Sequence, residues 1–187
     1  MLKIELPLAQ PSIWLQIKAL RCHDVCQLSP VMKARVLAIQ EDMKGTTSIT
    51  VNGKDYAFDP ILFETERKDT LQKIYYKQGT TRALSAIYGW HFYRVATDWI
   101  SASMEWSVPQ EWWDTLANFM GDHGIDPGNA WNEPDHPHGQ LGGLKKSPSD
   151  LTRQTYFNTT HWQGLPLFNG PEHEAALLRV WRIIGAV

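Results

Sequence analysis

The chain has 187 residues, 43% of them hydrophobic and 20% charged, and its formal net charge is -2. This length and composition fit one compact domain with a buried core and exclude extended disorder. The sequence contains no run of Lys and Arg residues, so it lacks the basic footprint with which proteins neutralise nucleic-acid phosphates. Its uncharged runs are far shorter than the roughly 20 apolar residues that a membrane helix needs. We therefore expect neither a nucleic-acid partner nor a membrane anchor.

The first residues and the cysteine content indicate where the protein is made and whether it contains disulfides. Glu5 lies where the apolar segment of a signal peptide would be, so we expect synthesis in the cytoplasm without a secretion signal. Two cysteines, Cys22 and Cys26, are too few for a disulfide framework. Their spacing suits one face of a helix or part of a metal site.

The N-terminal third has the patterns of two helices and a hairpin. Apolar residues at helical spacing predict a helix over residues 11–26. The predicted buried face of this helix consists of Ile13, Trp14, Ile17 and Leu20. A second helix is expected to run from the N-cap Ser29, which is followed by proline, to Gly45. Asn52 and Gly53, between two short β-forming segments, predict a hairpin.

The rest of the chain mixes strands and helices. Residues 61–64 and 95–100 are predicted strands, whereas residues 67–78 and 110–123 are predicted amphipathic helices. A terminal helix is expected to begin at Pro171. The residues expected to point inward from it are Leu177, Leu178, Trp181 and Ile184.

The order of these elements predicts the fold class. No internal repeat is evident, and no second domain can be separated. We predict an α+β fold in which helices flank a small antiparallel sheet, in a single domain over residues 1–187.

Two polar residues, His91 and Asp98, lie seven positions apart in the aromatic stretch of residues 89–100. Seven residues span about 23 Å as a strand and about 10 Å as a helix, so neither shape brings the two side chains together. If they serve one site, the chain bends between them, with His91 on a loop and Asp98 on the returning strand. The pair alone equally fits an ordinary loop histidine and a strand-end aspartate.

The sequence D-H-P-H at 135–138 contains the remaining groups for a catalytic zinc site. Such a site usually takes three protein ligands and leaves a fourth position for water. His91, Asp98 and His138 complete that set. Asp135, three residues before His138, then has the right chemistry to move a proton between water and a leaving amine.

These motifs resemble the zinc peptidases of the D-Ala-D-Ala carboxypeptidase and hedgehog fold, and in particular the phage L-alanyl-D-glutamate endopeptidases, or endolysins. The family pattern S-x-H-x-x-G-x-A-x-D, followed by D-x-P-H, is matched by G-W-H-F-Y-R-V-A-T-D at 89–98 and by D-H-P-H at 135–138. The resemblance implies that His91, Asp98 and His138 bind Zn²⁺ and that Asp135 is the catalytic acid and base.

A stretch further upstream is also similar to this family. F-E-T-E-R-K-D-T-L-Q-K-I-Y-Y-K-Q-G-T at 63–80 resembles its E-T-x-R motif, its five-residue spacing from Arg to Gln, and its L-Y-x-Q-G-R-T motif. By this match Arg67 lies near the metal and polarises the scissile carbonyl. The resemblance covers about residues 28–141, and neither the first 27 residues nor the tail beyond Gly143 is explained by it.

The chain departs from the family at two positions inside the first motif. Gly89 replaces the usual serine, and Arg94 replaces the glycine that normally permits the bend. The arginine is expected to narrow the cleft, to contact an acidic stem peptide, or to mark a site that no longer turns over.

The second motif contains an alternative register. Glu133 also lies three residues before a histidine, His136, in the E-x-x-H arrangement of the carboxypeptidase branch. Asp135 and His138 are preferred because the family's proline precedes the ligand histidine, as Pro137 does here.

The resemblance implies a zinc metallopeptidase that cleaves the stem peptide of bacterial peptidoglycan between L-Ala and D-Glu. Such an endolysin would be made in the host cytoplasm, act on the cell wall, and work as a monomer. One alternative is a D-Ala-D-Ala carboxypeptidase or dipeptidase on the same fold. Another is an inactive peptidoglycan-binding or virion protein.

Overall fold

The computed structural model describes residues 17–82, 86–144, 147–148 and 171–187. Residues 17–20 form a helical turn, after which Cys22 makes an isolated β-bridge with Glu66. The prediction of one helix as far as residue 26 is therefore wrong, because this backbone pairs with a distant segment instead of with itself. Leu20, expected to be buried, is 39% exposed. The predicted helical residues 11–16 lie outside the described residues.

Helix α2, Pro30–Asp42, begins as predicted. Ser29 Oγ accepts a hydrogen bond from the backbone N–H of Met32 at 3.3 Å, which satisfies one of the unpaired N–H groups of the first turn. Short 3₁₀ turns precede and follow the helix, η1 (Val25–Gln27) and η2 (Met43–Gly45). The fully buried side chains of α2 are Met32, Val36 and Ile39.

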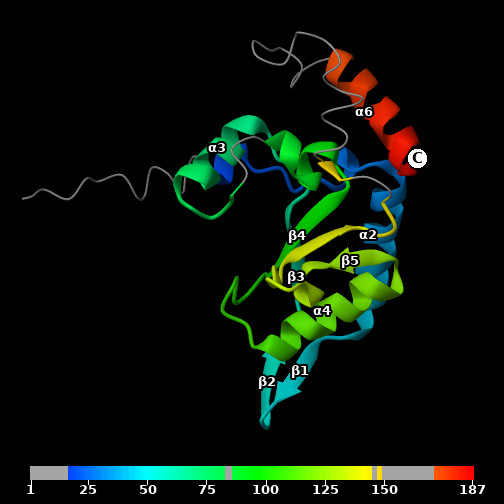
Figure 1. Cartoon of the computed structure of the whole chain (residues 1–187). Coiled ribbons are helices and arrows are strands. Elements are labelled where there is room, and N and C mark those ends of the chain that lie inside the picture. The colour runs from blue at the N-terminus through cyan, green and yellow to red at the C-terminus, as the bar shows by residue number, and fades with distance from the viewer. Residues whose placement is uncertain (1–16, 83–85, 145–146, 149–170) are drawn as a thin grey trace, which may run out of the picture.

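Strands β1 (Ser48–Val51) and β2 (Lys54–Ala57) form the predicted hairpin, which projects from the body of the molecule (Figure 1). Asn52 and Gly53 connect the strands with φ values of 51° and 77°. Both values are left-handed, as a type I′ turn requires, and Asn-Gly is the pair that adopts this turn most easily.

A second, four-stranded sheet forms the centre of the protein. Its order is β3-β4-β6-β5, and all neighbouring strands are antiparallel. The strands are β3 (Pro60–Glu64), β4 (Ala96–Ser101), β5 (Ile125–Pro127) and β6 (His138–Leu141). Every residue of β4 is buried, which explains why its sequence has no apolar and polar alternation.

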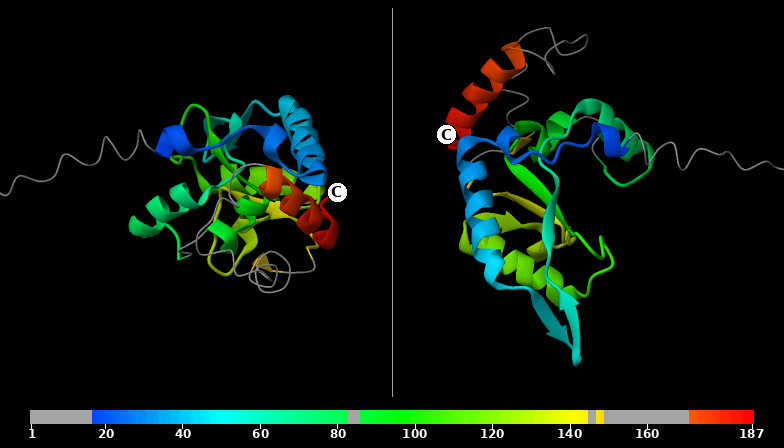
Figure 2. Two further views of the ribbon diagram at one scale, coloured as in Figure 1. Left: turned by 90° about the horizontal axis from the view of Figure 1, so that it is seen from above. Right: turned by 180° about the vertical axis from the view of Figure 1, so that it is seen from behind.

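Three further helices surround this sheet. They are α3 (Asp69–Lys77), α4 (Gln110–Asp122) and α6 (Pro171–Ile184). The segments between these helices contain the short 3₁₀ turns η3 (Ala86–Tyr88), η4 (Trp90–Tyr93) and η5 (Gly128–Ala130). Helix α3 lies on the opposite side of the molecule from α2 and α6 (Figure 2). One buried cluster joins α2, α4, β4 and α6, and its fully buried aromatic side chains are Tyr93, Trp99 and Trp112.

Helix α6 attaches the C-terminal segment to this core. Leu177, Trp181 and Ile184 are buried, and Trp181 Nε1 donates a hydrogen bond to the carbonyl oxygen of Tyr93 at 2.7 Å. Leu178, predicted to point inward, is 44% exposed. Trp181 and Ile184 follow Leu177 by four and seven positions, so the three buried residues lie on one helical face. Leu178 is about 100° away from Leu177 around the helix axis.

The α+β prediction is confirmed, with antiparallel sheets and flanking helices. Within the described part of the chain, no helix is both long enough and apolar enough to span a membrane. The extent of the domain over residues 1–187 stays a prediction.

Candidate metal centre and cleft

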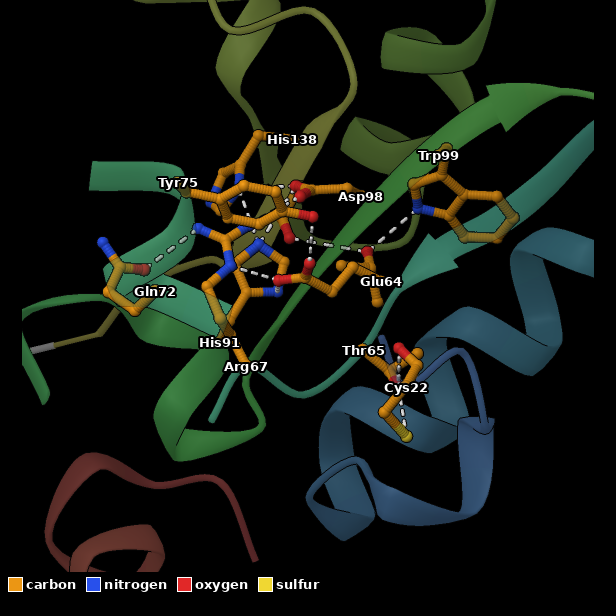
Figure 3. Close-up of polar contacts among 12 residues, drawn as sticks. Cys22, Glu64, Thr65, Arg67, Gln72, Tyr75, His91, Asp98, Trp99 and His138 are labelled. Carbon is orange, nitrogen blue, oxygen red and sulfur yellow. Dashed lines mark hydrogen bonds and ion pairs between the residues drawn. The ribbon is translucent and has the colours of Figure 1, made fainter. Parts of the chain in front are cut away.

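The candidate site is built where three strands of the central sheet lie side by side. Asp98 of β4 is paired with Glu64 of β3 on one side and with His138 of β6 on the other. Side chains of directly paired residues project from the same face of a sheet. The sheet therefore brings two carboxylates and one imidazole together (Figure 3).

His91 reaches this place from outside the sheet. It lies on η4, and the chain returns into β4 through Arg94, whose φ of 58° and ψ of 35° are left-handed. This is the bend that the spacing of His91 and Asp98 required.

The facing atoms of His91, Asp98 and His138 form a nearly equilateral triangle. His91 Nε2 is 3.0 Å from Asp98 Oδ1 and 3.3 Å from His138 Nδ1, and His138 Nδ1 is 3.1 Å from Asp98 Oδ1. Three ligands about 2.0–2.1 Å from one ion at tetrahedral angles lie about 3.3 Å apart. All three residues are buried, and two imidazoles with one carboxylate suit zinc. The residues therefore fit a metal ion, and their assignment as zinc ligands stays a prediction.

Burial and the neighbouring charges shift the pKa values of these three residues. Burial lowers the pKa of His91, which favours the neutral imidazole that metals bind. Burial would raise the pKa of Asp98, but the neighbouring His91 and His138 hold it well below its usual value. Burial would lower the pKa of His138, but its hydrogen bond and attraction to Asp98 raise it. Asp98 is thus the ionised centre of the group.

Arg67 follows β3 and extends over the same groups. Its Nε donates to Glu64, its Nη2 donates to Asp98 Oδ2 at 3.1 Å, and its Nη1 donates to Gln72 Oε1 at 3.4 Å. The ring centroid of Tyr75 is 4.9 Å from the guanidinium carbon. Burial would lower the pKa of Arg67, but Glu64 and Asp98 raise it, so the guanidinium stays charged. Arg67 is a fixed cation beside the three candidate ligands.

A cleft of about 550 Å³ opens over these residues, with Arg67, Asp98 and Asp135 in its wall. Its other lining includes the aromatic residues Phe63, Tyr75 and Trp106 and the polar residues Gln78, Thr80 and Thr81. A second hollow beside Trp131 shares Thr80, Thr81 and Asp135 with the cleft. The two adjoin, so an extended ligand has room to lie across the candidate site.

Asp135 lies at the exposed rim of the cleft. Its backbone N–H donates to Gly128 O at 3.0 Å, and its carbonyl oxygen accepts from the backbone N–H of His138 at 3.0 Å. Partial loss of water raises the pKa of its carboxyl group, and the negative charge of Asp98 raises it further. A carboxyl group of this kind at a cleft mouth is suited to proton transfer.

The alternative register is not brought into the triangle. Glu133 is exposed and forms an ion pair with Arg82 at 3.1 Å. His136 hydrogen-bonds through Nδ1 to Asn129, and its ring stacks on Trp113 with centroids 6.2 Å apart. These partners direct both side chains away from the three facing ligand atoms.

Arg94 does not line the cleft. Its Nη2 donates to Glu66 Oε1 at 2.9 Å and to Glu174 Oε1 of α6 at 2.8 Å, and its side chain is 9% exposed. The expectations that Arg94 narrows the cleft or contacts substrate are therefore wrong, because two carboxylates already hold its guanidinium. Gly89 has an extended backbone, with φ of -121°, which other residues also adopt.

Sequence reasoning assigned no role to Glu64 or Tyr75. Glu64 is fully buried, and Tyr75 donates a hydrogen bond through its hydroxyl to Glu64 Oε2 at 3.2 Å. Glu64 is the first residue of the E-T-x-R motif, and this was the sequence signal that could have indicated a role for it. Regular strand alternation would have placed Glu64 on the opposite face from Asp98, and only an irregularity in β3 changes that.

No protein-family model and no curated protein matches the chain. Among solved structures, the chain is similar to the Serratia marcescens L-Ala D-Glu endopeptidase ChiX, with 16% sequence identity and a TM-score of 0.47. That match covers 63% of this chain and 82% of ChiX.

Proposed function

We propose that this protein is a zinc-dependent peptidase that cleaves the stem peptide of bacterial peptidoglycan between L-Ala and D-Glu. The observation that carries the proposal is the convergence of His91, Asp98 and His138 beside a cleft that is lined by Asp98, Arg67 and Asp135. The substrate and the endolysin role are supported by the motif resemblance, in which these same five residues match the family's ligands and catalytic groups.

The chain's own residues have distinct tasks in this reaction. His91, Asp98 and His138 would hold a zinc ion, which would supply a Lewis acid and make water at the site more acidic. Asp135 accepts a proton from the attacking water and returns it to the leaving amine, so one peptide bond and one water become a carboxylic acid and an amine. Arg67 donates hydrogen bonds to the oxyanion that develops on the scissile carbonyl.

The position of Arg67 suits this task. Glu64, Gln72 and Asp98 hold its guanidinium, so little reorganisation is needed when negative charge develops.

Asp135 is nearer to solvent than the candidate ligands, where it can exchange protons.

The test is to incubate the purified protein with peptidoglycan and to identify the fragments by mass spectrometry, with and without chelator. We expect new L-Ala carboxyl and D-Glu amino termini, loss of the reaction with chelator, and recovery on adding zinc. Metal analysis of the same sample measures zinc stoichiometry.

Other products would redirect the proposal. Release of free D-Ala with no cleavage at L-Ala would identify a D-Ala-D-Ala carboxypeptidase or dipeptidase. Wall binding with no fragments in the presence of zinc would support the inactive binding protein and contradict the peptidase proposal.

A further inference from the structure

Glu64 is a buried carboxylate at the edge of the candidate metal centre. It ends β3, is 0% exposed, and lies beside Asp98 in the register of the sheet. A buried carboxylate is costly unless charges and hydrogen bonds compensate it. Its surroundings therefore indicate what it does (Figure 3).

A β-bulge turns Glu64 toward the candidate site. Leu62 pairs with Trp99, but the register then shifts, so that Glu64 pairs with Asp98. In a regular ladder Glu64 would oppose Thr97 and share the face of Trp99, because side chains alternate. The extra residue, Phe63, moves Glu64 to the face of Asp98. Such bulges are typical next to active sites, where they redirect a side chain.

Two neighbours fix the Glu64 carboxylate once it is there. Arg67 Nε donates to Oε1, and the Tyr75 hydroxyl donates to Oε2 at 3.2 Å. Each carboxylate oxygen therefore has a donor, and one of the donors is a cation. The carboxylate is held in place without any contribution from the candidate ligands.

The remaining neighbour is the far side of the His91 ring. His91 Nδ1 is 3.9 Å from Glu64 Oε1, and within the described part of the chain this buried nitrogen has no hydrogen-bond partner. Its other nitrogen, Nε2, faces Asp98 and His138. A buried donor without a partner costs about 1–3 kcal/mol, so its environment needs an explanation.

We propose that Glu64 is a positioning residue for the metal centre: it attracts Nδ1–H of His91 and so keeps Nε2 of that ring turned toward the metal. This inference rests on the proposed zinc site. Histidine ligands generally direct their second nitrogen at a carboxylate, carbonyl or water, which fixes the tautomer and makes the ligand nitrogen more basic. Arg67 and Tyr75 make Glu64 rigid enough to set the orientation of the ring.

The chain contains a matched control two residues away. Glu66 is also a buried carboxylate paired with an arginine, but its partner is Arg94, outside the cleft. Glu64→Gln and Glu66→Gln therefore remove the same charge from similar surroundings, and only the first faces His91.

The experiment measures zinc affinity of the full chain by competition with a chromophoric chelator. We expect Glu64→Gln to bind zinc about 10–100-fold more weakly than the parent protein and Glu66→Gln to bind it within about twofold. The visible spectrum of the cobalt-substituted protein, which reports on ligand geometry, is expected to change for Glu64→Gln alone.

Equal zinc affinity of the two variants would overturn the proposal. If Glu64→Gln does not fold, the pair Glu64→Asp and Glu66→Asp replaces it: shortening the side chain at Glu64 withdraws the carboxylate from His91, and we expect about tenfold weaker zinc binding. Equal affinity of that pair would likewise refute the role of Glu64. A parent protein without stoichiometric zinc would instead refute the proposed function.

Discussion

Asp135 and His138 are three residues apart, and the proposed reaction gives them different tasks. His138 contributes an atom to the triangle of candidate ligands, whereas Asp135 lies at the rim and contributes none. We expect Asp135→Asn to retain zinc and to lose about 10²–10⁴-fold in hydrolysis rate, since it removes only proton transfer. We expect His138→Ala to lose both. Metal analysis and a fragment assay on the same preparations measure the two effects.

Two results would contradict this assignment. Full hydrolysis by Asp135→Asn would show that another group moves the proton. Stoichiometric zinc in a folded protein with His91, Asp98 and His138 all replaced would refute the ligand set.

Arg94 combines an unfavourable backbone conformation with favourable side-chain contacts. A left-handed non-glycine residue costs roughly 1–2 kcal/mol, but breaking a buried ion pair costs about 3–5 kcal/mol. We therefore expect Arg94→Gly to lower the free energy of unfolding by about 1–4 kcal/mol in denaturant titrations, because Glu66 would remain buried without its cation. Zinc binding should be unchanged.

The double variant Arg94→Gly with Glu66→Gln is the control for that prediction. It removes the unpaired charge and is expected to recover part of the lost stability. A more stable Arg94→Gly protein would mean that the strain exceeds the value of the ion pairs with Glu66 and Glu174.

The turn that contains Asp135 packs against Gly128, the first residue of η5. Gly128 O accepts hydrogen bonds from the N–H groups of Trp131 and Asp135. A Cβ atom on Gly128 would overlap the carbonyl oxygen of Asp135 and lie 3.2 Å from His138 Cβ. We expect Gly128→Ala to displace this turn, weaken zinc binding and lower hydrolysis by at least about tenfold, measured by chelator competition and the fragment assay.

Gly121 of α4 offers a matched substitution. A Cβ atom there meets nothing within 4 Å, so Gly121→Ala should leave activity unchanged and stabilise the helix by about 0.5–1 kcal/mol. Equal activity of the two alanine variants would show that the turn tolerates the displacement.

Several elements were predictable because their signals are local. The N-cap Ser29 and the Asn52-Gly53 turn act through their own backbone and nearest neighbours, and both structures are as predicted. The bulge at Phe63 was not predictable, because it depends on how β3 aligns with β4. Helix periodicity also misplaced Leu178, since the pattern alone did not locate the edge of the buried face.

The candidate ligands come from η4, β4 and β6, so only the folded chain brings them together. A ligand that binds only the native state stabilises it, by about 2.7 kcal/mol when its concentration is 100 times its dissociation constant. For a chain of this length we expect zinc at that concentration to raise the melting temperature by about 5–10 °C. Calorimetry with zinc and with chelator measures the shift.

His138→Ala is the control for this effect and is expected to show no zinc-dependent shift. A parent protein whose melting temperature is unaffected by zinc would contradict a native metal site built from these residues.

The residue types needed for metal binding and proton transfer, and their order along the chain, can be read from the sequence, because spacing and motif are properties of the chain itself. Residue type and spacing were enough to make His91, Asp98, His138 and Asp135 candidates, and the motif resemblance added Arg67. The sequence also predicted the bend between His91 and Asp98, since no regular element of seven residues joins them at one point.

Which distant groups meet depends on the folded structure. It placed Glu64 beside Asp98 through a bulge, and it paired Arg94 with Glu174, 80 positions away in the sequence. Such contacts depend on strand register and on the packing of α6, which many residues determine jointly and no short pattern encodes. Arg94 therefore pairs with a residue of the C-terminal helix and lies outside the cleft lining.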